Sequence, residues 1–267
     1  MFKNFTIVVR GGGDIATGII HRLYRAGFKV IVLEVEKPSL IRRRVSFGQS
    51  IYDKEIEIEG IKSKHVETFS EAIECLEQGI IPVIIDEQGE IIKNNKIDVV
   101  VDAILAKKNL GTTMEMASVI IGVGPGFTVG KDVHAIIESN RGHNLGKVIL
   151  EKNKSAESNT GIPGNIMGFT EERVVRAVGE GNIKIVKDIG ALVKKRDVLA
   201  TIEGKKVEAK IDGVVRGMIN EGFYVFDGMK IGDIDPRGNK ENCFEISDKA
   251  RSVGGGVLEA VCYLLNK

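Results

Sequence analysis

Two hydrophobic periods alternate along the first half of the chain. Phe5 to Val9 and Lys29 to Val35 are short β-branched runs typical of buried strands. The segment between them carries apolar residues at helical spacing, at Ile15, Ile19, Ile20 and Leu23. Further along, the pattern predicts strands at 56–58, 82–86, 98–105 and 117–121 and helices at 70–78 and 131–138.

This alternation of strands and helices predicts an α/β fold. We expect a Rossmann-like, mostly parallel sheet domain over residues 1–165 that binds a nucleotide or cofactor. The turn-rich stretch 159–165 is the predicted linker to the second half.

The second half contains an internal repeat. Residues 177–203 and 209–235 are a faint copy of each other at an offset of 32, with the pairs Gly181/Gly213, Gly190/Gly222, Val193/Val225 and Ile202/Ile234. Two short sheets related in this way make a flattened barrel-sandwich, which resembles biotinyl and lipoyl domains. The run Asp212-Gly213-Val214-Val215 resembles theirs closely. We therefore expect a small all-β barrel-sandwich module over residues 170–240.

Biotinyl and lipoyl domains carry their cofactor on a lysine at the tip of the hairpin that joins the halves. The equivalent tip holds Lys205 and Lys206, but methionines do not flank them and the hairpin is shorter. Covalent biotin or lipoate is not expected, and the module is interpreted as structural or docking. Residues 241–267 are predicted to form a Gly-rich loop and an amphipathic helix. The helix packs on one of the domains or on a second subunit of a homo-oligomer.

A glycine-rich loop of dinucleotide type joins the first predicted strand to the first helix. Its cofactor-binding candidates are Gly11, Gly12, Gly13, Asp14 and Ala16. Glycines let backbone N–H groups approach a phosphate, and a helix N-terminus favours negative charge. Glu34, at the end of the second strand, suits a ribose hydroxyl. Alternatively the loop is a tight turn that binds nothing, Asp14 is a first-turn acid that would repel a phosphate, and Glu34 is a solvated strand end.

A second group of candidates lies further along. Asp102 is toward the carboxyl end of a buried strand, and Gly122, Gly124 and Gly126 form another rigid loop. Because both loops follow buried strands, we expect them at the same carboxyl edge of one sheet. Arg141 suits a phosphate or a carboxylate.

Three further features admit two interpretations each. His143 is either an acid–base group or structural, and Arg42-Arg43-Arg44 either grips a phosphate or forms a solvated face. Asp102 has a turn or capping role as its alternative. No Ser-His-Asp order and no metal-ligand spacing is visible, so catalytic residues stay unassigned and no metal is expected.

Composition and charge limit the partners and the cellular compartment that we expect for this protein. The formal net charge is +1, which gives no general attraction to nucleic acid or to an anionic membrane. No apolar run approaches the roughly 20 residues that span a bilayer. Cys75, Cys243 and Cys262 are an odd number without close spacing, which fits a reducing cytosol. We expect a cytoplasmic protein.

Four segments together resemble a known family. They are Val9-Arg10-Gly11-Gly12-Gly13-Asp14-Ile15-Ala16-Thr17-Gly18, Gly122-Val123-Gly124-Pro125-Gly126-Phe127, Asp132-Val133-His134 with Arg141-Gly142-His143, and Asn159-Thr160-Gly161-Ile162-Pro163-Gly164. The chain resembles the YqeB-type accessory proteins of selenium-dependent molybdenum hydroxylases. These are similar to the XdhC/CoxF maturation factors.

The resemblance implies a factor that helps a molybdenum hydroxylase mature. It would bind the molybdopterin cofactor, or a nucleotide-like part of it, and would act with the hydroxylase and its other maturation proteins. No cysteine lies in either glycine loop, so none is assigned to sulfur handling. The alternative is an NAD(P)-dependent oxidoreductase that uses the Gly11–Ala16 loop.

Overall fold

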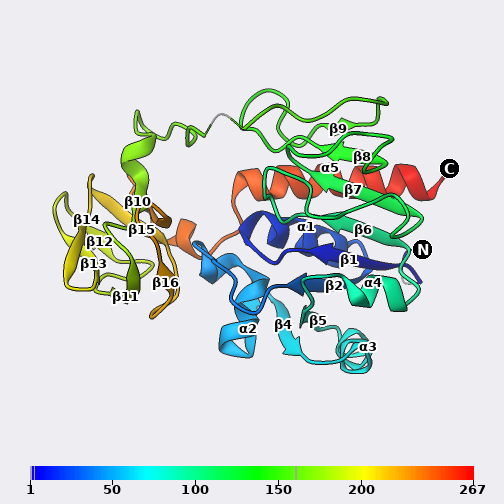
Figure 1. Ribbon diagram of the computed structural model, residues 1–267, viewed down its shortest axis with the longest axis horizontal. Helices are drawn as coiled ribbons and strands as arrows, with labels where there is room; N and C mark the ends of the chain where they lie inside the picture. The colour runs from blue at the N-terminus through cyan, green and yellow to red at the C-terminus, as the bar shows by residue number, and fades with distance from the viewer. Residues whose placement is uncertain (1, 3, 160) are drawn as a thin grey trace. The chain divides into compact units, whose positions relative to one another are not determined.

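The structure is a computed structural model that describes residues 2, 4–159 and 161–267. The chain forms two compact units, neither of which is one continuous segment (Figure 1). Unit 1 comprises Met1–Pro38, Ser46–Asn159 and Ile246–Lys267, and unit 2 comprises Ser39–Val45 and Thr160–Glu245. These boundaries differ from the predicted ones at 165 and 240, because the closing helix packs into unit 1 and a short early segment packs into unit 2.

Unit 1 is built on a nine-stranded sheet with the order β3-β4-β5-β2-β1-β6-β7-β8-β9. The strands from β4 to β8 run parallel, whereas β3 and β9 pair antiparallel at the two edges. The strands are β1 (Thr6–Arg10), β2 (Lys29–Glu34), β3 (Glu55–Ile58), β4 (Ile61–Val66), β5 (Ile81–Ile85), β6 (Val99–Asp102), β7 (Val119–Val123), β8 (Ala135–Ile137) and β9 (Val148–Ile149).

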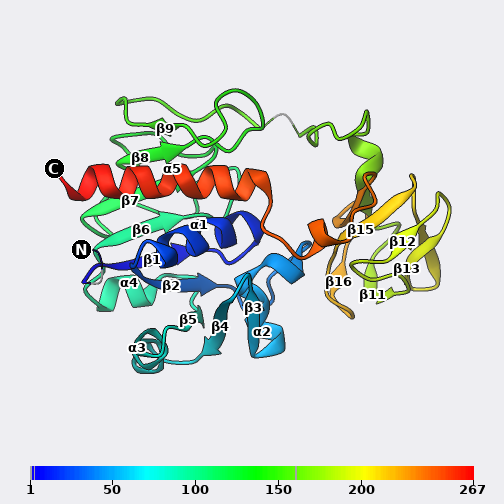
Figure 2. The same cartoon turned by 180° about the vertical axis from the view of Figure 1, so that it is seen from behind.

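Helices cover both faces of this sheet. α1 (Asp14–Arg25) and α5 (Asp248–Leu265) lie side by side on one face, as both views show (Figures 1 and 2). α3 (Phe69–Glu77) and α4 (Glu90–Asn94) belong to the cluster on the other face, and the short α2 (Ser50–Asp53) packs near β3–β5. The helix predicted at 70–78 is α3, and Thr68 begins it with a capping box.

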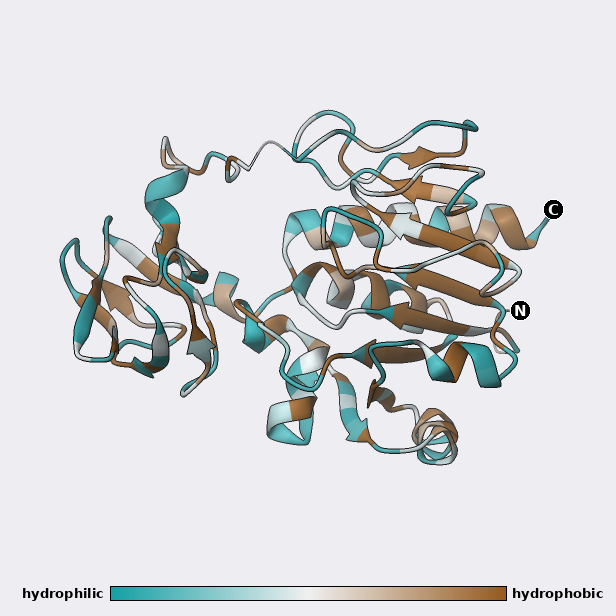
Figure 3. Cartoon of the chain, viewed as in Figure 1, coloured by the Kyte–Doolittle hydropathy of each residue, from teal (hydrophilic) through white to brown (hydrophobic). Residues whose placement is uncertain are grey.

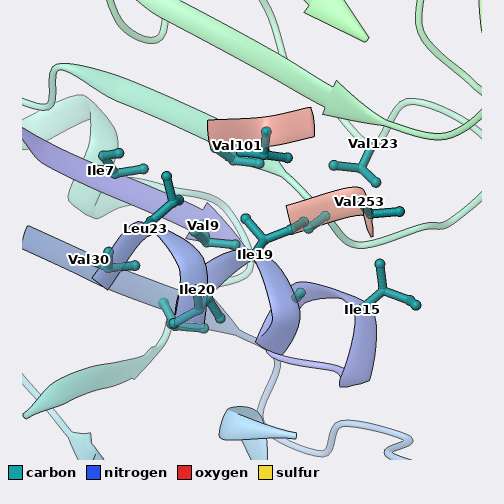
Figure 4. Packing of buried hydrophobic residues seen from close by; sticks show 14 of the residues in the cluster. Ile7, Val9, Ile15, Ile19, Ile20, Leu23, Val30, Val101, Val123 and Val253 are labelled. Carbon is teal, nitrogen blue, oxygen red and sulfur yellow. The ribbon is translucent and has the colours of Figure 1, made fainter. Parts of the chain in front are cut away.

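Side chains alternate between the two faces of each strand, which divides the core of unit 1 in two. On the α1 face, Ile7, Val9 and Val101 pack against Ile19 and Val253 (Figure 4). On the other face, a second cluster holds Val8, Ile31, Val100 and Ile120. The central strands are hydrophobic almost throughout (Figure 3), as expected of parallel strands buried on both faces.

The contact between α1 and α5 depends on glycine. A Cβ on Gly18 would lie 2.4 Å from the carbonyl oxygen of Ala250, and a Cβ on Gly254 would lie 2.4 Å from the carbonyl oxygen of Gly18. Gly256 is equally restricted, because its Cβ would lie 2.1 Å from the carbonyl oxygen of Gly146. The Gly-rich loop predicted before the closing helix is therefore part of the helix, and its glycines allow close packing.

Unit 2 consists of two four-stranded antiparallel sheets, β10-β17-β15-β12 and β14-β13-β11-β16, around a hydrophobic cluster of its own. A shift of 32 residues carries β10–β13 onto β14–β17, and the two sheets then have the same strand order. The strands are β10 (Val174–Arg176), β11 (Gly181–Ile185), β12 (Leu192–Val193), β13 (Val198–Ile202), β14 (Lys205–Glu208), β15 (Gly213–Met218), β16 (Tyr224–Val225) and β17 (Lys230–Asp235).

The predicted fold class is wrong as stated. Unit 1 is a mixed sheet with antiparallel strands at both edges, and the crossovers from β6 to β7 and from β7 to β8 contain no helix. The closing helix α5 covers those strands instead. Unit 2 has two separate antiparallel sheets, and the biotinyl- or lipoyl-like description is not retained. The hydrophobic period locates strands, but it does not determine which strands pair or in which direction.

Two local predictions also fail. The helix expected at 131–138 is absent, because Ala135–Ile137 form the buried strand β8. The arginine run is not a solvated face as a whole, because only Arg44 is exposed. Arg42 is buried and donates to the carbonyl oxygens of Asn242 and Glu245, and buried Arg43 donates to Met218 and pairs with Asp188. These bonds hold segment 39–45 in unit 2. Thr160 of the predicted linker lies outside the described residues.

We expect Gly254→Ala to lower the free energy of unfolding by about 1–3 kcal/mol, because the new methyl group must push α5 away from the backbone of α1. The neighbouring Gly255→Ala is the matched control, since nothing lies within 4 Å of its Cβ position. That substitution should stabilise the helix by about 0.5–1 kcal/mol. Urea unfolding of both variants measures the difference, and equal effects would contradict the helix contact described here.

Candidate functional site

The two predicted glycine loops lie at the same edge of the sheet of unit 1. β1, β6 and β7 are parallel neighbours, so the loops that follow β1 and β7 leave the sheet at its carboxyl edge. The shared-edge prediction is confirmed. The N-terminus of α1 begins at this edge, directly after the first loop. Ligands of open α/β sheets collect at this edge, which makes it the candidate site.

Glycine is required in the first loop by close backbone packing. Gly11 has a φ of +97°, and a Cβ there would lie 3.0 Å from the carbonyl oxygen of Ala103. Gly12 packs against another glycine, Gly48. The amide of Gly48 donates to the carbonyl oxygen of Gly12 at 2.9 Å. A Cβ on Gly12 would lie 2.7 Å from the amide nitrogen of Gly48. Both glycines therefore admit neighbouring segments of the chain, which is a structural reason for their presence.

The helix start is the part of this loop that is closest to solvent. Gly13 is the N-cap of α1, and Asp14 is its first helical residue; both are partly buried. Ala16 is 1% exposed and packs in the core, so its side chain is part of the hydrophobic cluster.

Glu34 forms a hydrogen bond with the backbone of the first loop. Its carboxylate accepts from the amide of Gly12 and from the amide of Val35, both at 3.3 Å. Burial raises the pKa of Glu34 above its ordinary value, and these two hydrogen bonds oppose the rise. The carboxylate expected at a ribose hydroxyl thus contacts the backbone of the loop itself.

Asp102 belongs to a buried polar network at the end of β6. Its Oδ2 accepts from the Thr112 hydroxyl at 2.6 Å and from Nη1 of Arg10 at 3.4 Å, while its Oδ1 accepts from the amide of Ile104 at 3.2 Å. Arg10 is 5% exposed, Asp102 2% and Thr112 1%. The network fastens the loop after β6 to the ends of two strands.

Sequence reasoning missed Arg10 and Thr112 as members of this network. Arg10 could have been found, because it is the last residue of β1 and stands in register with Asp102, the last residue of the parallel neighbour β6. Thr112 had no comparable signal. It reaches Asp102 only because the loop after β6 folds back.

That loop, residues 103–118, was also missed. Leu105 and Lys107 have φ values of +60° and +64°, a backbone conformation that side chains other than glycine rarely adopt. Such residues concentrate at functional sites, where the surrounding structure holds them in place. Lys107 and Lys108 are exposed, so the loop brings two cations to the carboxyl edge.

The second glycine loop packs against this same loop. Gly126, with φ +111°, would place a Cβ 2.8 Å from the Cα of Lys108. Gly124, with φ +78°, faces Ser139, and its amide donates to the carbonyl oxygen of Ile137 at 2.8 Å. Gly122 lies within β7 rather than in the loop, and the ring of Phe127 covers it.

Arg141 lies on the exposed loop after β8 and pairs with Asp248, the first residue of α5. Both terminal nitrogens of the guanidinium group donate to the carboxylate, Nη1 to Oδ2 at 2.7 Å and Nη2 to Oδ1 at 2.9 Å. The sequence analysis assigned the Arg141 guanidinium to an anionic ligand, but in the structure it binds the carboxylate of Asp248. His143 is exposed on the same loop.

Within the described residues, no group of three or more His, Cys, Asp or Glu side chains is arranged to hold a metal ion. No helix in the described part of the chain is long and apolar enough to cross a membrane.

We expect Asp102→Ala to lower the free energy of unfolding by about 3–5 kcal/mol, because it leaves the Arg10 guanidinium buried without its carboxylate. The double replacement Arg10→Met with Asp102→Leu should cost less than the single change, since it removes both charges. Thermal and urea unfolding compare the two. A double variant that is less stable than Asp102→Ala would show that packing, rather than the buried charge, sets the cost.

Comparison with known proteins gives one relative by sequence. No model of a known protein family matches the chain. The chain is 51% identical over 261 residues to a protein described as uncharacterized protein YqeB, from Escherichia coli strain K12. The match covers 98% of this chain and 48% of that protein, so the chain spans about half the length of the curated relative it matches.

Solved structures give distant matches. They include an aspartoacylase family protein from Mesorhizobium loti, 10% identical, covering 80% of this chain and 59% of that chain with a TM-score of 0.26. The ectoine utilization protein EutE (DoeB) from Ruegeria pomeroyi is 13% identical, with coverages of 88% and 86% and a TM-score of 0.26. A succinylglutamate desuccinylase from Silicibacter sp. TM1040 is 10% identical, with coverages of 88% and 85% and a TM-score of 0.27. Over 98% of its own length, this chain is similar to about half of the uncharacterized protein YqeB.

Proposed function

We propose that this chain is a cytoplasmic accessory factor in the maturation of a selenium-dependent molybdenum hydroxylase. It binds the molybdopterin-type cofactor, or a nucleotide-like part of it, at the carboxyl edge of the sheet in unit 1. The observation that carries the proposal is that the first turn of α1 and the strained loop that bears Lys107 and Lys108 both lie at that edge, where the start of the loop packs against Gly11.

The helix start and the lysines of this edge suit a phosphate, and their positive charge opposes the negative charge of Asp14 in the first turn of α1. The first backbone N–H groups of a helix have no partner within the helix, and the helix dipole favours an anion there. Lysine ammonium groups add positive charge without a fixed direction, which suits a phosphate that carries a large organic group. The phosphate of molybdopterin and that of a nucleotide both meet this description.

The cellular part of the proposal comes from the resemblance of the four segments to the YqeB-type accessory proteins, and the 51% identity to the uncharacterized protein YqeB is consistent with that resemblance. The hydroxylase and its other maturation proteins would be the partners.

Binding is tested with purified protein and four probes: molybdopterin, CTP, NAD and NADP. A specific ligand stabilises the folded protein by mass action and so raises its melting temperature. At a free ligand concentration of a hundred times Kd, the free energy of unfolding rises by about 2.7 kcal/mol. We expect molybdopterin or CTP to stabilise the protein. If only NAD or NADP stabilises the protein, this proposal is wrong and the chain is better described as an NAD(P)-dependent oxidoreductase.

The double variant Lys107→Gln with Lys108→Gln should weaken binding of the effective probe at least tenfold, because it removes both cations of the loop. Lys29→Gln with Lys96→Gln is the matched control. It removes the same charge from exposed positions at the starts of β2 and β6, at the opposite edge of the sheet. Equal affinity in the two double variants would contradict binding at the carboxyl edge.

In cells, deletion of the gene should leave the hydroxylase polypeptide synthesised but inactive. Immunoblotting measures the polypeptide and an activity assay measures the loss, and the wild-type gene should restore activity while the Lys107→Gln, Lys108→Gln variant should not. Full hydroxylase activity in the deletion strain would refute the maturation role, whatever the purified protein binds.

A further inference from the structure

A pocket of about 400 Å³ lies beside α1 and α5, on residues that the candidate site does not use. Its lining is mostly basic and includes two apolar residues: His21, Arg22, Arg25, Ala26, Arg251 and Leu258. Every one of these residues belongs to unit 1. The volume falls in the range typical of small-molecule sites.

The charge of the pocket is strongly unbalanced. Arg251 donates to Oε1 of Glu59 at 2.7 Å, and that carboxylate also accepts from the amide of Ile246 at 2.8 Å. Arg22 and Arg25 are exposed on the C-terminal half of α1. One carboxylate therefore stands against three guanidinium groups.

His21 adds a buried polar atom to the pocket, close to the Glu59 carboxylate. The residue is 5% exposed, and its Nε2 is buried without a hydrogen bond, 3.6 Å from Oε2 of Glu59. Burial lowers the pKa of His21, Glu59 raises it, and Arg25, Arg251 and Arg22 lower it further. A buried polar atom of this kind is unusual in a native protein, where such atoms nearly always have a partner.

We infer that this pocket is a second anion site, which takes the phosphate group of an organic phosphate. Arginine suits that group because its planar fork donates two parallel hydrogen bonds to phosphate oxygens. Ala26 and Leu258 offer an apolar surface to the organic part. The inference goes beyond the proposed function: Gly13 and Arg25 are separated by about 18 Å along the helix, at 1.5 Å per residue.

Histidine-selective NMR tests the site directly. The chain has four histidines, so the labelled protein gives few signals, and His21→Gln assigns the one from the pocket. We expect AMP and inorganic phosphate to move the His21 signals in a saturable way, while adenosine leaves them in place. An anion also favours the imidazolium form, so the pKa of His21 should rise when AMP is bound.

The variants Arg22→Gln and Arg25→Gln, alone and combined, should weaken AMP binding at this signal, the double variant at least tenfold. Lys96→Gln with Lys131→Gln removes the same charge from exposed positions elsewhere in unit 1 and should bind as the wild type does. The signals of His65, His134 and His143 report whether each variant is folded, and the single variants serve if the double one is not.

Two results would overturn the inference: His21 signals that stay in place at millimolar AMP and phosphate, or an equal response to adenosine. The Lys107→Gln, Lys108→Gln variant separates this site from the proposed function. It should lose binding at the carboxyl edge and keep the His21 response, so each site can fail without the other.

Discussion

The close contact of α1 with α5 is the constraint on which the rest of unit 1 depends. Two helices can approach this closely only where the side chain is a hydrogen atom, and Gly18 and Gly254 provide that at the point of contact. The contact joins the last residues of the chain to the first strand–helix unit. It also covers β7 and β8, whose own crossovers contain no helix.

The same contact positions the basic pocket and the ion pair between Arg141 and Asp248. It places Arg251 beside Arg22 and Arg25, so that a basic pocket forms from two helices that are more than 200 residues apart in the chain. Three residues before Arg251 in the same helix, Asp248 pairs with Arg141 from the loop after β8. A change in helix separation would therefore affect the pocket, and also the ion pair that ties the loop after β8 to α5.

The glycine loops show how one residue type can have two explanations. Gly11, Gly12 and Gly126 each lie against the backbone of another segment, so packing alone requires glycine there. What remains for a ligand is the first turn of α1 and the cations of the loop after β6. The strained backbone at Leu105 and Lys107 is held by a buried network, because Thr112 ties the far end of that loop to Asp102. The site thus depends on a loop that has no glycine-rich signature.

The sequence by itself determined the local elements with a clear hydrophobic period, which are the buried strands β1, β2, β5 and β6 and the capped helix α3. It also determined the 32-residue repeat, which the structure shows as two sheets with the same strand order. It also indicated that both glycine loops share one edge, because that follows from strand direction. Only the tertiary structure decided that β3 and β9 run antiparallel, that 135–137 is a strand, that Arg42 and Arg43 are buried, and that Arg10 pairs with Asp102. These features arise between residues distant in the chain. A hydrophobic period records which face of an element is buried, but it carries no information about which distant segment buries it.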